Sequence, residues 1–486
     1  MAETFTMTRR IGNALVLALA CALIGAACSA TATADQRGAS SSGGTRYSQS
    51  GATSPTSRPR IPNRSLPPPR LAAREPVVQQ GAPEVAGDNV AGEAVEWDAQ
   101  PGYEQGSYEQ GGYEQGDADW WDPAYAAEQS CQPAYYVRGE YLHWWLSGDD
   151  TPPLVTTSPQ GTPRLQAGVL GQPGTTVLFG DDELSDEGRS GARIVLGRQL
   201  TSCTKIEAEW FDLGETGEDF TATSTGNPIL ARPFFNVVTV AQDAFLVAYP
   251  NVREGTIFAT TTSRFMGGLI NIYKDWDPGI NIDGAQLSMG WGLRFLRLEE
   301  NLSIGDSLTS VDPAGPVPVG TQFATSDAFG TTNNFIGFNL GLRSQWQHER
   351  WNLSCSSNLG IGQTGSKVNI SGRSSTTTPA GATTNFNGGL LALPTNIGNY
   401  ERYELGFVPQ IQLKLAYEIT RNARIVVGYD SMLWTSVVRP GDQIDPSLNL
   451  SQASGQPLVG QASPTFSFQE SLLWVQGVSI GGELRF

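Results

Sequence analysis

The feature that most constrains this chain is an alternation of apolar and polar side chains, which begins after Cys131 and recurs to the C-terminus. A period of two residues is the signature of a β-strand with two chemically different faces. In residues 287–295 the odd-numbered positions are Leu, Met, Trp, Leu and Phe, whereas the even-numbered ones are Ser, Gly, Gly and Arg. Runs of this length match the about nine to eleven residues with which a tilted strand crosses a bilayer. The pattern favours strands with one lipid-facing and one polar face.

The alternation predicts about ten strands, with eight or twelve as alternatives. Tight turns alternate with connections of roughly thirty to forty-five residues, as in outer-membrane barrels. An even strand number places all tight turns and both barrel ends on the periplasmic side. We therefore predict an all-β fold, a closed antiparallel transmembrane β-barrel within residues 131–486. The predicted strands are 135–146, 190–200, 204–213, 260–274, 283–298, 334–346, 350–362, 403–417, 422–434 and 470–486.

The N-terminal part of the chain has a different composition. The mean hydropathy is -0.24 and the only long apolar run lies at the N-terminus, which excludes a helical membrane protein. Residues 1–34 are predicted to be a signal peptide, because a positive start precedes an apolar core and small-residue cleavage sites. Acylation at Cys28 is the alternative. Export across the inner membrane is expected in either case.

Residues 35–130 are predicted to be a disordered linker, because they are rich in Gly, Pro, Ser, Gln and Ala and lack periodicity. The first half is basic and rich in proline, and the second half is acidic, so part of the net charge of -17 belongs to this tether. The acidic half holds three copies of Tyr-Glu-Gln-Gly, starting at Tyr103, Tyr108 and Tyr113. These copies are either a motif for a cell-envelope partner or duplicated linker, and the composition favours the linker.

Charged side chains on the expected interior face are the candidate functional residues. One interpretation is a selectivity lining, because rings of charge set ion preference in a narrow pore. The other is a plug of paired charges, because the interior of a small barrel is barely wider than its side chains. The strand number favours the plug or a very narrow channel. The candidates are Arg138, Glu140, Lys205, Glu207, Glu209, Arg294, Arg343, Lys414, Arg424 and Asp430.

Nothing in the sequence resembles a catalytic, cofactor or metal site. His143 and His348 are expected on opposite sides of the membrane, and neither has a nearby nucleophile and orienting acid. The five cysteines form no cluster with metal-ligand spacing. Residues 439–442 (Arg-Pro-Gly-Asp) are either a ligand-facing loop or a turn with Pro at the corner and Gly at positive φ, and the turn is favoured. We predict that the protein is not an enzyme and needs no cofactor.

Two features suggest how the barrel enters and contacts the membrane. Phe486 ends an alternating strand at the C-terminus and is a candidate signal for the outer-membrane assembly machinery. Aromatic side chains near strand ends are expected in the girdles at the two membrane surfaces. They are Trp144, Trp145, Trp346, Trp351, Tyr417 and Trp434.

Several motifs resemble those of a known family. They are 135–141 (Tyr-Tyr-Val-Arg-Gly-Glu-Tyr), 191–197 (Gly-Ala-Arg-Ile-Val-Leu-Gly) followed by Trp-Phe-Asp-Leu at 210–213, 292–300 (Gly-Leu-Arg-Phe-Leu-Arg-Leu-Glu-Glu) and, most specifically, 429–434 (Tyr-Asp-Ser-Met-Leu-Trp) with 437–445. On these motifs residues 131–486 resemble the planctomycete-type outer-membrane beta-barrel porin family. The resemblance implies a barrel in the cell outer membrane with no assigned transport substrate.

Two functions are compatible with these features. The first is a porin-like or narrow diffusion channel of the outer membrane. The second is a structural or adhesive barrel with a plugged lumen that anchors surface loops. Outer-membrane lipids, the assembly machinery and a cell-envelope partner of the N-terminal segment are the expected partners, and nucleic acid is not.

Overall fold

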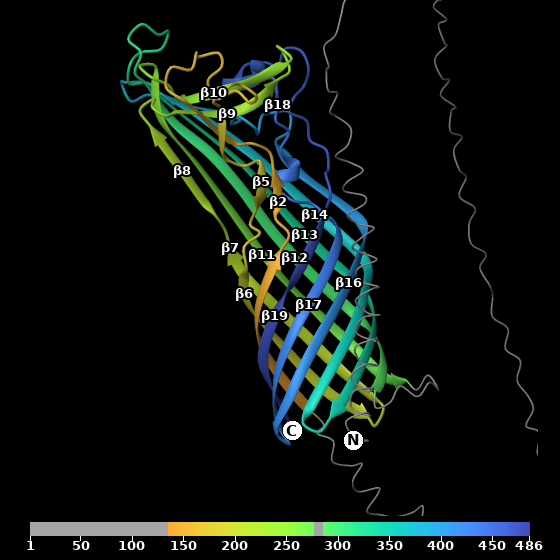
Figure 1. Cartoon of the computed structure of the whole chain (residues 1–486). Coiled ribbons are helices and arrows are strands. Elements are labelled where there is room, and N and C mark those ends of the chain that lie inside the picture. Colours follow the sequence, from red (N-terminus) through yellow and green to blue (C-terminus); the bar gives the residue numbers. More distant parts are fainter. Residues whose placement is uncertain (1–134, 277–284) are drawn as a thin grey trace, which may run out of the picture. The chain divides into compact units, whose positions relative to one another are not determined.

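The chain forms a closed ring of ten antiparallel strands (Figure 1). The computed structural model describes residues 135–276 and 285–486. The first and last strands pair from Tyr136 opposite Arg485 to Leu146 opposite Val475, which closes the ring. The predicted all-β closed barrel of ten strands is confirmed. In ring order the strands are β1(Tyr135–Leu146), β6(Arg189–Thr201), β7(Thr204–Thr216), β11(Arg253–Trp276), β12(Ala285–Ser310), β13(Gln322–His348), β14(Trp351–Thr377), β16(Gly398–Thr420), β17(Ala423–Val437) and β19(Ser471–Arg485).

The predicted signal peptide (1–34) and linker (35–130), with Cys28 and the tyrosine-containing copies, lie outside the described residues. Within 135–276 and 285–486, no helix is both long and apolar enough to cross a membrane.

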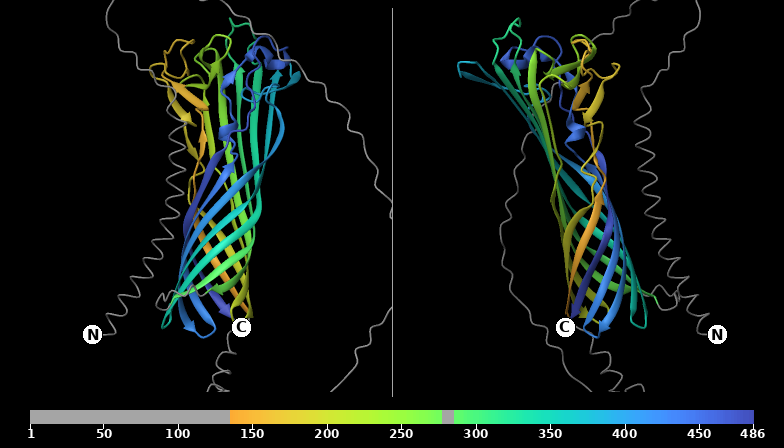
Figure 2. Two further views of the ribbon diagram at one scale, coloured as in Figure 1. Left: turned by 90° about the vertical axis from the view of Figure 1, so that its right-hand side faces the viewer. Right: turned by 60° about the vertical axis from the view of Figure 1, so that its left-hand side comes forward.

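The strands agree with the prediction at their lower ends and exceed it at their upper ends. The lower end carries the C-terminus and two-residue turns at 202–203, 349–350 and 421–422, so it faces the periplasm. β12, β13 and β14 contain 26, 27 and 27 residues, which is about 15 more than a bilayer needs, or roughly 50 Å of additional strand. The expected long connection at 299–333 is therefore wrong, because only 311–321 separates β12 from β13. Figure 2 shows these long strands rising above the barrel on one side.

The long strands extend beyond the membrane because their apolar side chains move from the outer face to the inner face partway along each strand. In the lower part of β12 the exposed residues are Met289, Trp291 and Leu293, and they face lipid. From Leu296 upward most buried inner positions are apolar, as at Ile304, with Glu300 and Asp306 as the charged exceptions, and the outer positions are polar. Two consecutive apolar residues mark the change on several strands, and they therefore mark the outer membrane surface. These pairs are Trp144-Trp145, Trp210-Phe211, Phe265-Met266, Phe295-Leu296, Phe335-Ile336 and Leu433-Trp434.

A second sheet covers the inner face of the extended strands above the membrane (Figure 1). Its apolar residues, such as Val155, Leu230 and Phe234, pack with Ile304 and Phe329 of the extensions in one core. The sheet has the order β10-β9-β3-β4, and β18 pairs with β9. Its strands are β3(Val155–Ser158), β4(Thr176–Phe179), β9(Ile229–Asn236), β10(Ala241–Ala248) and β18(Ser447–Leu448), and the other upper elements are β2(Asp149–Thr151), β5(Asp182–Leu184), β8(Asp219–Ser224), β15(Thr383–Asn387), η1(Gly441–Gln443) and η2(Leu450–Gly455).

A buried ion-paired arginine also ties the second sheet to the extended strands. Arg232 of β9 donates to Asp306 of β12 at 2.9 Å and to Asp327 of β13 at 2.6 Å. Asp327 also accepts hydrogen bonds from the backbone N–H groups of Leu390, Leu391 and Ala392. Both oxygens of the buried Asp327 are thereby satisfied, as burial of charge requires, whereas only Oδ1 of Asp306 has hydrogen-bond partners.

Candidate functional site: the barrel interior

The lower interior is occupied by an ion-pair network centred on Arg193 of β6. Its guanidinium lies 3.2 Å from Glu140, 3.6 Å from Glu209 and 2.8 Å from Asp430. The alternation along β1, β7 and β17 turns these three carboxylates inward, because their sequence neighbours face lipid. Arg193 was missed by the sequence analysis, although it alternates with the exposed Ile194 as an interior residue should. A single buried cation thus connects three strands across the interior.

Further ion pairs extend this network toward the periplasmic end. Glu140 also accepts a hydrogen bond from Lys414 at 2.7 Å, and it forms an ion pair with Arg138 at 2.7 Å. Arg138 and Arg424 then share Glu483, at 3.4 and 2.7 Å. Glu140 and Glu483 are each placed between cations, so positive and negative charges are paired within the barrel.

A second group of charges lies beside this network. Arg343 donates two hydrogen bonds to Glu207, at 2.7 and 2.6 Å, a bidentate geometry that fixes both side chains. Glu207 also accepts from the hydroxyl of Tyr136. Lys205 donates to Gln345 at 3.3 Å. Asn271, Asn339 and Asn358 join as a buried amide cluster, which the sequence analysis did not identify.

Arg294 differs from the other interior cations. It is 2% exposed and donates to Gln410 and, at 3.7 Å, to the sulfur of Met432. Among the described residues, no carboxylate lies within ion-pair distance of it. All ten sequence candidates therefore point into the interior. Nine of them lie in or beside the two groups of charges, and Arg294 lies at the upper edge of these groups.

An apolar layer lies directly above the charges, at the level of the outer membrane surface. Trp144, Phe265, Phe335 and Trp434 are each 0% exposed although they point into the ring. Trp434 lies 6.4 Å from Phe265 and 6.2 Å from Phe335, centroid to centroid, and Trp144 is linked to Phe265 through the ring of Phe211, at 5.2 and 5.3 Å. The expected girdle position of Trp144 and Trp434 is wrong, because the hydrophobic face has already changed to the inside there. The full layer is Leu142, Trp144, Leu146, Phe211, Leu213, Phe265, Leu296, Leu298, Phe335, Val408, Met432, Trp434, Val437, Leu473 and Val475.

A third layer, above the apolar one, holds the last long loop in the barrel mouth. Arg439 of this loop donates to both oxygens of Glu300 on β12, at 3.0 and 2.6 Å, and to the carbonyl oxygens of Ser147 and Gly148. Its guanidinium is 3.9 Å from Asp149. Residues 439–442 form the start of a turn, η1, as predicted, but glycine is needed there for a different reason. A Cβ at Gly441 would lie 2.3 Å from the carbonyl oxygen of Asp150.

The electrostatics of this upper layer are uneven. Burial would lower the pKa of Arg439, but the contact with Glu300 raises it. Burial raises the pKa of Asp149 to about 8, and the nearby Glu300 adds to this increase while Arg439 opposes it. Burial also raises the pKa of Asp442. Glu300 is therefore the close ion-pair partner of Arg439, and burial favours the protonated form of Asp149 in the folded state.

The remaining sequence candidates lie on the outer surface. His143 packs edge-on against Trp145 near the upper membrane surface, at 4.6 Å between centroids, and His348 stacks on Trp346 at the lower end. Phe486 lies at the seam between β1 and β19, where its N–H donates to the backbone carbonyl oxygen of Tyr135 at 2.8 Å.

In the part of the chain that the structure describes, no group of three or more His, Cys, Asp or Glu could hold a metal ion.

The closed ring, the apolar outer band and the inward charges define an antiparallel transmembrane β-barrel. The chain belongs to the family described as "Putative beta barrel porin-7 (BBP7)", whose model matches residues 136–486. The protein is accordingly an outer-membrane barrel in contact with the lipids of that membrane. The planctomycete part of the family resemblance stays a prediction.

Solved structures with a similar fold have low identity to this chain. The Escherichia coli outer membrane protease OmpT is 11% identical, covers 72% of this chain and 97% of its own, and has a TM-score of 0.33. A Pseudomonas aeruginosa FadL homologue is 7% identical, with 73% and 91% covered and a TM-score of 0.21. The P. putida toluene transporter TodX is 7% identical, with 74% and 92% covered and a TM-score of 0.16. No curated protein matches the chain.

Proposed function

We propose that this barrel is closed to passive diffusion and that it anchors a folded extracellular platform in the outer membrane. The observation that carries the proposal is the apolar layer. A water-filled channel exposes the side chains that line it, yet Trp144, Phe265, Phe335 and Trp434 are inaccessible to water. Hydrated ions and polar solutes would have to cross this layer without water, at the cost of desolvation.

The charges below the layer support a closed interior. A selectivity lining presents its charges to passing ions. Here Glu140 and Arg193 have fully buried side chains, and each contacts more than one opposite charge. Such contacts hold strands together across the barrel, and they leave little unbalanced field for a passing ion.

The platform is the part of the molecule that a closed barrel would serve. The extended strands and the second sheet share one apolar core, and the buried Arg232 pairs connect them. A rigid membrane-spanning base would fix the orientation of this surface relative to the cell. A binding partner of the platform, like a cell-envelope partner of the N-terminal segment, belongs to the proposal.

A narrow or gated channel is the second candidate, because the family is one of porins and because Arg294 offers an interior cation without an ion pair among the described residues. Opening would require Trp144 and Trp434 to move aside. An enzymatic role is not part of either candidate, since both histidines lie on the outer face and pack against tryptophans.

Conductance distinguishes the candidates. In planar bilayers we expect the folded, heat-modifiable wild-type protein to be silent, and Trp144→Ala/Trp434→Ala to conduct. Trp474→Ala is the matched control, because Trp474 is 44% exposed on the lipid-facing side of β19. Each interior substitution is expected to destabilise the barrel by about 3–5 kcal/mol, so folding is checked by cold gel electrophoresis. Discrete, salt-dependent conductance of the wild type would overturn the proposal in favour of the channel.

A further inference from the structure

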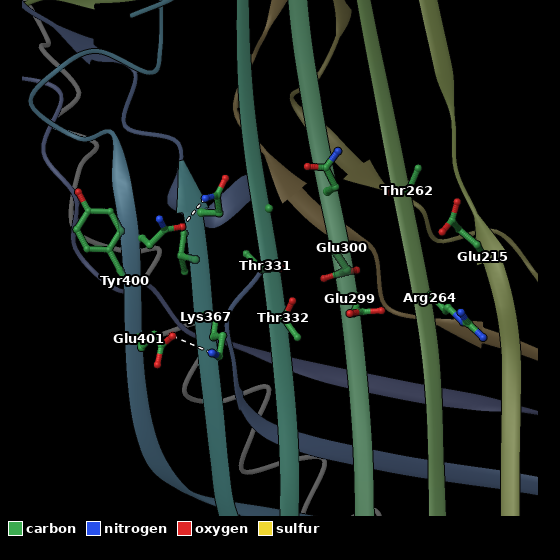
Figure 3. A pocket seen from close by; sticks show the side chains of 15 residues that line it. Glu215, Thr262, Arg264, Glu299, Glu300, Thr331, Thr332, Lys367, Tyr400 and Glu401 are labelled. Carbon is green, nitrogen blue, oxygen red and sulfur yellow. Dashed lines mark hydrogen bonds and ion pairs between the residues drawn. The ribbon is translucent and has the colours of Figure 1, made fainter. Parts of the chain in front are cut away.

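A groove of about 470 Å³ lies against the outer side of the extended strands, just above the lipid-facing band (Figure 3). It does not belong to the barrel interior described above. Its lining comes from six neighbouring strands, β7, β11, β12, β13, β14 and β16. A surface built from so many paired strands is held rigidly in place.

The groove is lined by two rows of side chains that follow the strand register. In the lower row the charges alternate in sign, with one threonine between them, and in the upper row amide side chains flank a glycine. The lower row is Glu215, Arg264, Glu299, Thr332, Lys367 and Glu401, each opposite the next on the neighbouring strand. The upper row is Thr262, Asn301, Gly330, Asn369 and Asn399.

The depth of the groove corresponds to the headgroups of the outer leaflet. On β13 the last lipid-facing residue is Ile336, which is 64% exposed, and Thr332 is four residues above it. Four residues span about 13 Å of strand, or about 10 Å along the membrane normal at a tilt near 40°. Leu405 on β16 is 62% exposed at the level of Ile336. The groove is therefore continuous with the lipid-contacting surface.

The lining is suited to hydroxyl groups rather than to phosphate. Asparagine amides both donate and accept, and carboxylates accept, so together they match groups that also do both. Asn369 donates one hydrogen bond to Asn399 and Asn301 donates one to Ser303, which uses one of the two N–H groups of each amide. The outward acids Glu215, Glu299 and Glu401 outnumber the bases Arg264 and Lys367. Both bases already have carboxylate partners, Arg264 with an aspartate of β7 at 2.6 Å and Lys367 with Glu401 at 2.8 Å. A phosphate would meet an excess of negative charge.

From the depth and the chemistry together, we infer that the groove binds the saccharide headgroup of a neutral glycolipid in the outer leaflet. Gly330 forms the floor at the centre of the upper row. A Cβ built there would have only the side-chain oxygen of Asn301 nearby, at 3.5 Å, so the space above the glycine is open. This space admits a sugar ring between the asparagines of β12 and β14.

The open space also provides the test. Gly330→Trp should fill the groove without displacing backbone, and Gly139→Trp is the matched control, because Gly139 has no atom within 4 Å of its Cβ position on β1. Full-length protein in detergent is titrated with digalactosyldiacylglycerol, with phosphatidylglycerol and with free digalactosylglycerol. Native mass spectrometry counts the bound lipid. The variants are first checked for heat modifiability.

We expect wild type and Gly139→Trp to retain the galactolipid and Gly330→Trp to bind it about tenfold more weakly, since about 1.4 kcal/mol of polar contact corresponds to tenfold. Asn369→Leu, which leaves the floor open, should weaken binding in the same direction. Equal binding by Gly330→Trp would overturn the site. Equal retention of phosphatidylglycerol would overturn the neutral saccharide as ligand, and equally tight binding of free digalactosylglycerol would overturn the assignment to a membrane lipid.

Discussion

The ion pair between Arg439 and Glu300 is predicted to hold the last long loop in the barrel mouth. Arg439→Met removes one partner of a pair whose side chains are 2% and 4% exposed. It leaves the buried carboxylate of Glu300 uncompensated and the carbonyl oxygens of Ser147 and Gly148 without their donor. Breaking a buried pair in this way costs about 3–5 kcal/mol, whereas removing both charges costs less. The double variant Arg439→Met/Glu300→Gln should therefore regain on the order of 2 kcal/mol over the sum of the single effects.

The assay is a double-mutant cycle of urea unfolding for protein refolded in lipid vesicles. Tryptophan fluorescence reports on the layer just below the pair, because Trp144 and Trp434 lie there. Arg485 and Glu418 provide the control cycle: they are 3.4 Å apart, but 27% and 26% exposed, so their coupling should stay below about 1 kcal/mol. Additive effects of Arg439→Met and Glu300→Gln, or a cost of Arg439→Met within the range of the control, would refute the reasoning.

Three further predictions concern protonation, assembly and the platform. Burial raises the pKa of Asp149 from 3.8 to about 8, so between these pH values this group binds more protons in the folded state than in the unfolded state. Its contribution to stability should therefore fall as the pH rises from 3.8 to about 8. Asp149→Asn should make the urea midpoint fall less steeply with pH, and an unchanged slope would contradict this prediction. Phe486→Lys should reduce assembly into the outer membrane of cells far more than Leu484→Lys, although both side chains are over half exposed and a charge near the interface costs about 0–1 kcal/mol. Equal heat-modifiable fractions of the two variants would show that Phe486 is not an assembly signal. Arg232→Met should lower the stability of the platform by about 3–5 kcal/mol and make its loops sensitive to protease, while the barrel stays heat-modifiable. If the variant resists protease as well as the wild type does, the ion pairs of Arg232 with β12 and β13 are dispensable.

The sequence predicted the membrane part of the fold because lipid and lumen impose opposite polarity on alternate residues. Exposed Leu405 and Phe407 and buried Gln410 follow this rule on β16. The rule fails above Phe295 on β12, where water replaces lipid outside and a protein core replaces the polar lumen inside. The alternation continues there with the faces exchanged, and a connection was predicted from residue 299 onward, where the strand continues to Ser310.

The interior residues were predictable one by one, but their partners were not. Inward orientation follows from strand parity alone, and it placed Glu207 and Arg343 correctly on the inside. Their contact joins positions 136 residues apart in the chain. It depends on the register between the strands that lie between β7 and β13 in the ring, and local sequence does not show this register. Arg439 was interpreted as part of a turn because nothing local shows that its loop folds back to Glu300, 139 residues away.

The exchange of hydrophobic faces at paired residues such as Phe295-Leu296 also fixes how deeply the barrel lies in its bilayer. If the barrel moved toward the periplasm by one pair of residues along its strands, Arg297 and Asn334 would enter the hydrocarbon. If it moved the same distance toward the cell exterior, Ile336 would enter water. Both directions are opposed on several strands at once. When the surrounding membrane is thinner or thicker than the apolar band, the protein cannot slide or tilt far to compensate, so the lipid must thin or thicken around it.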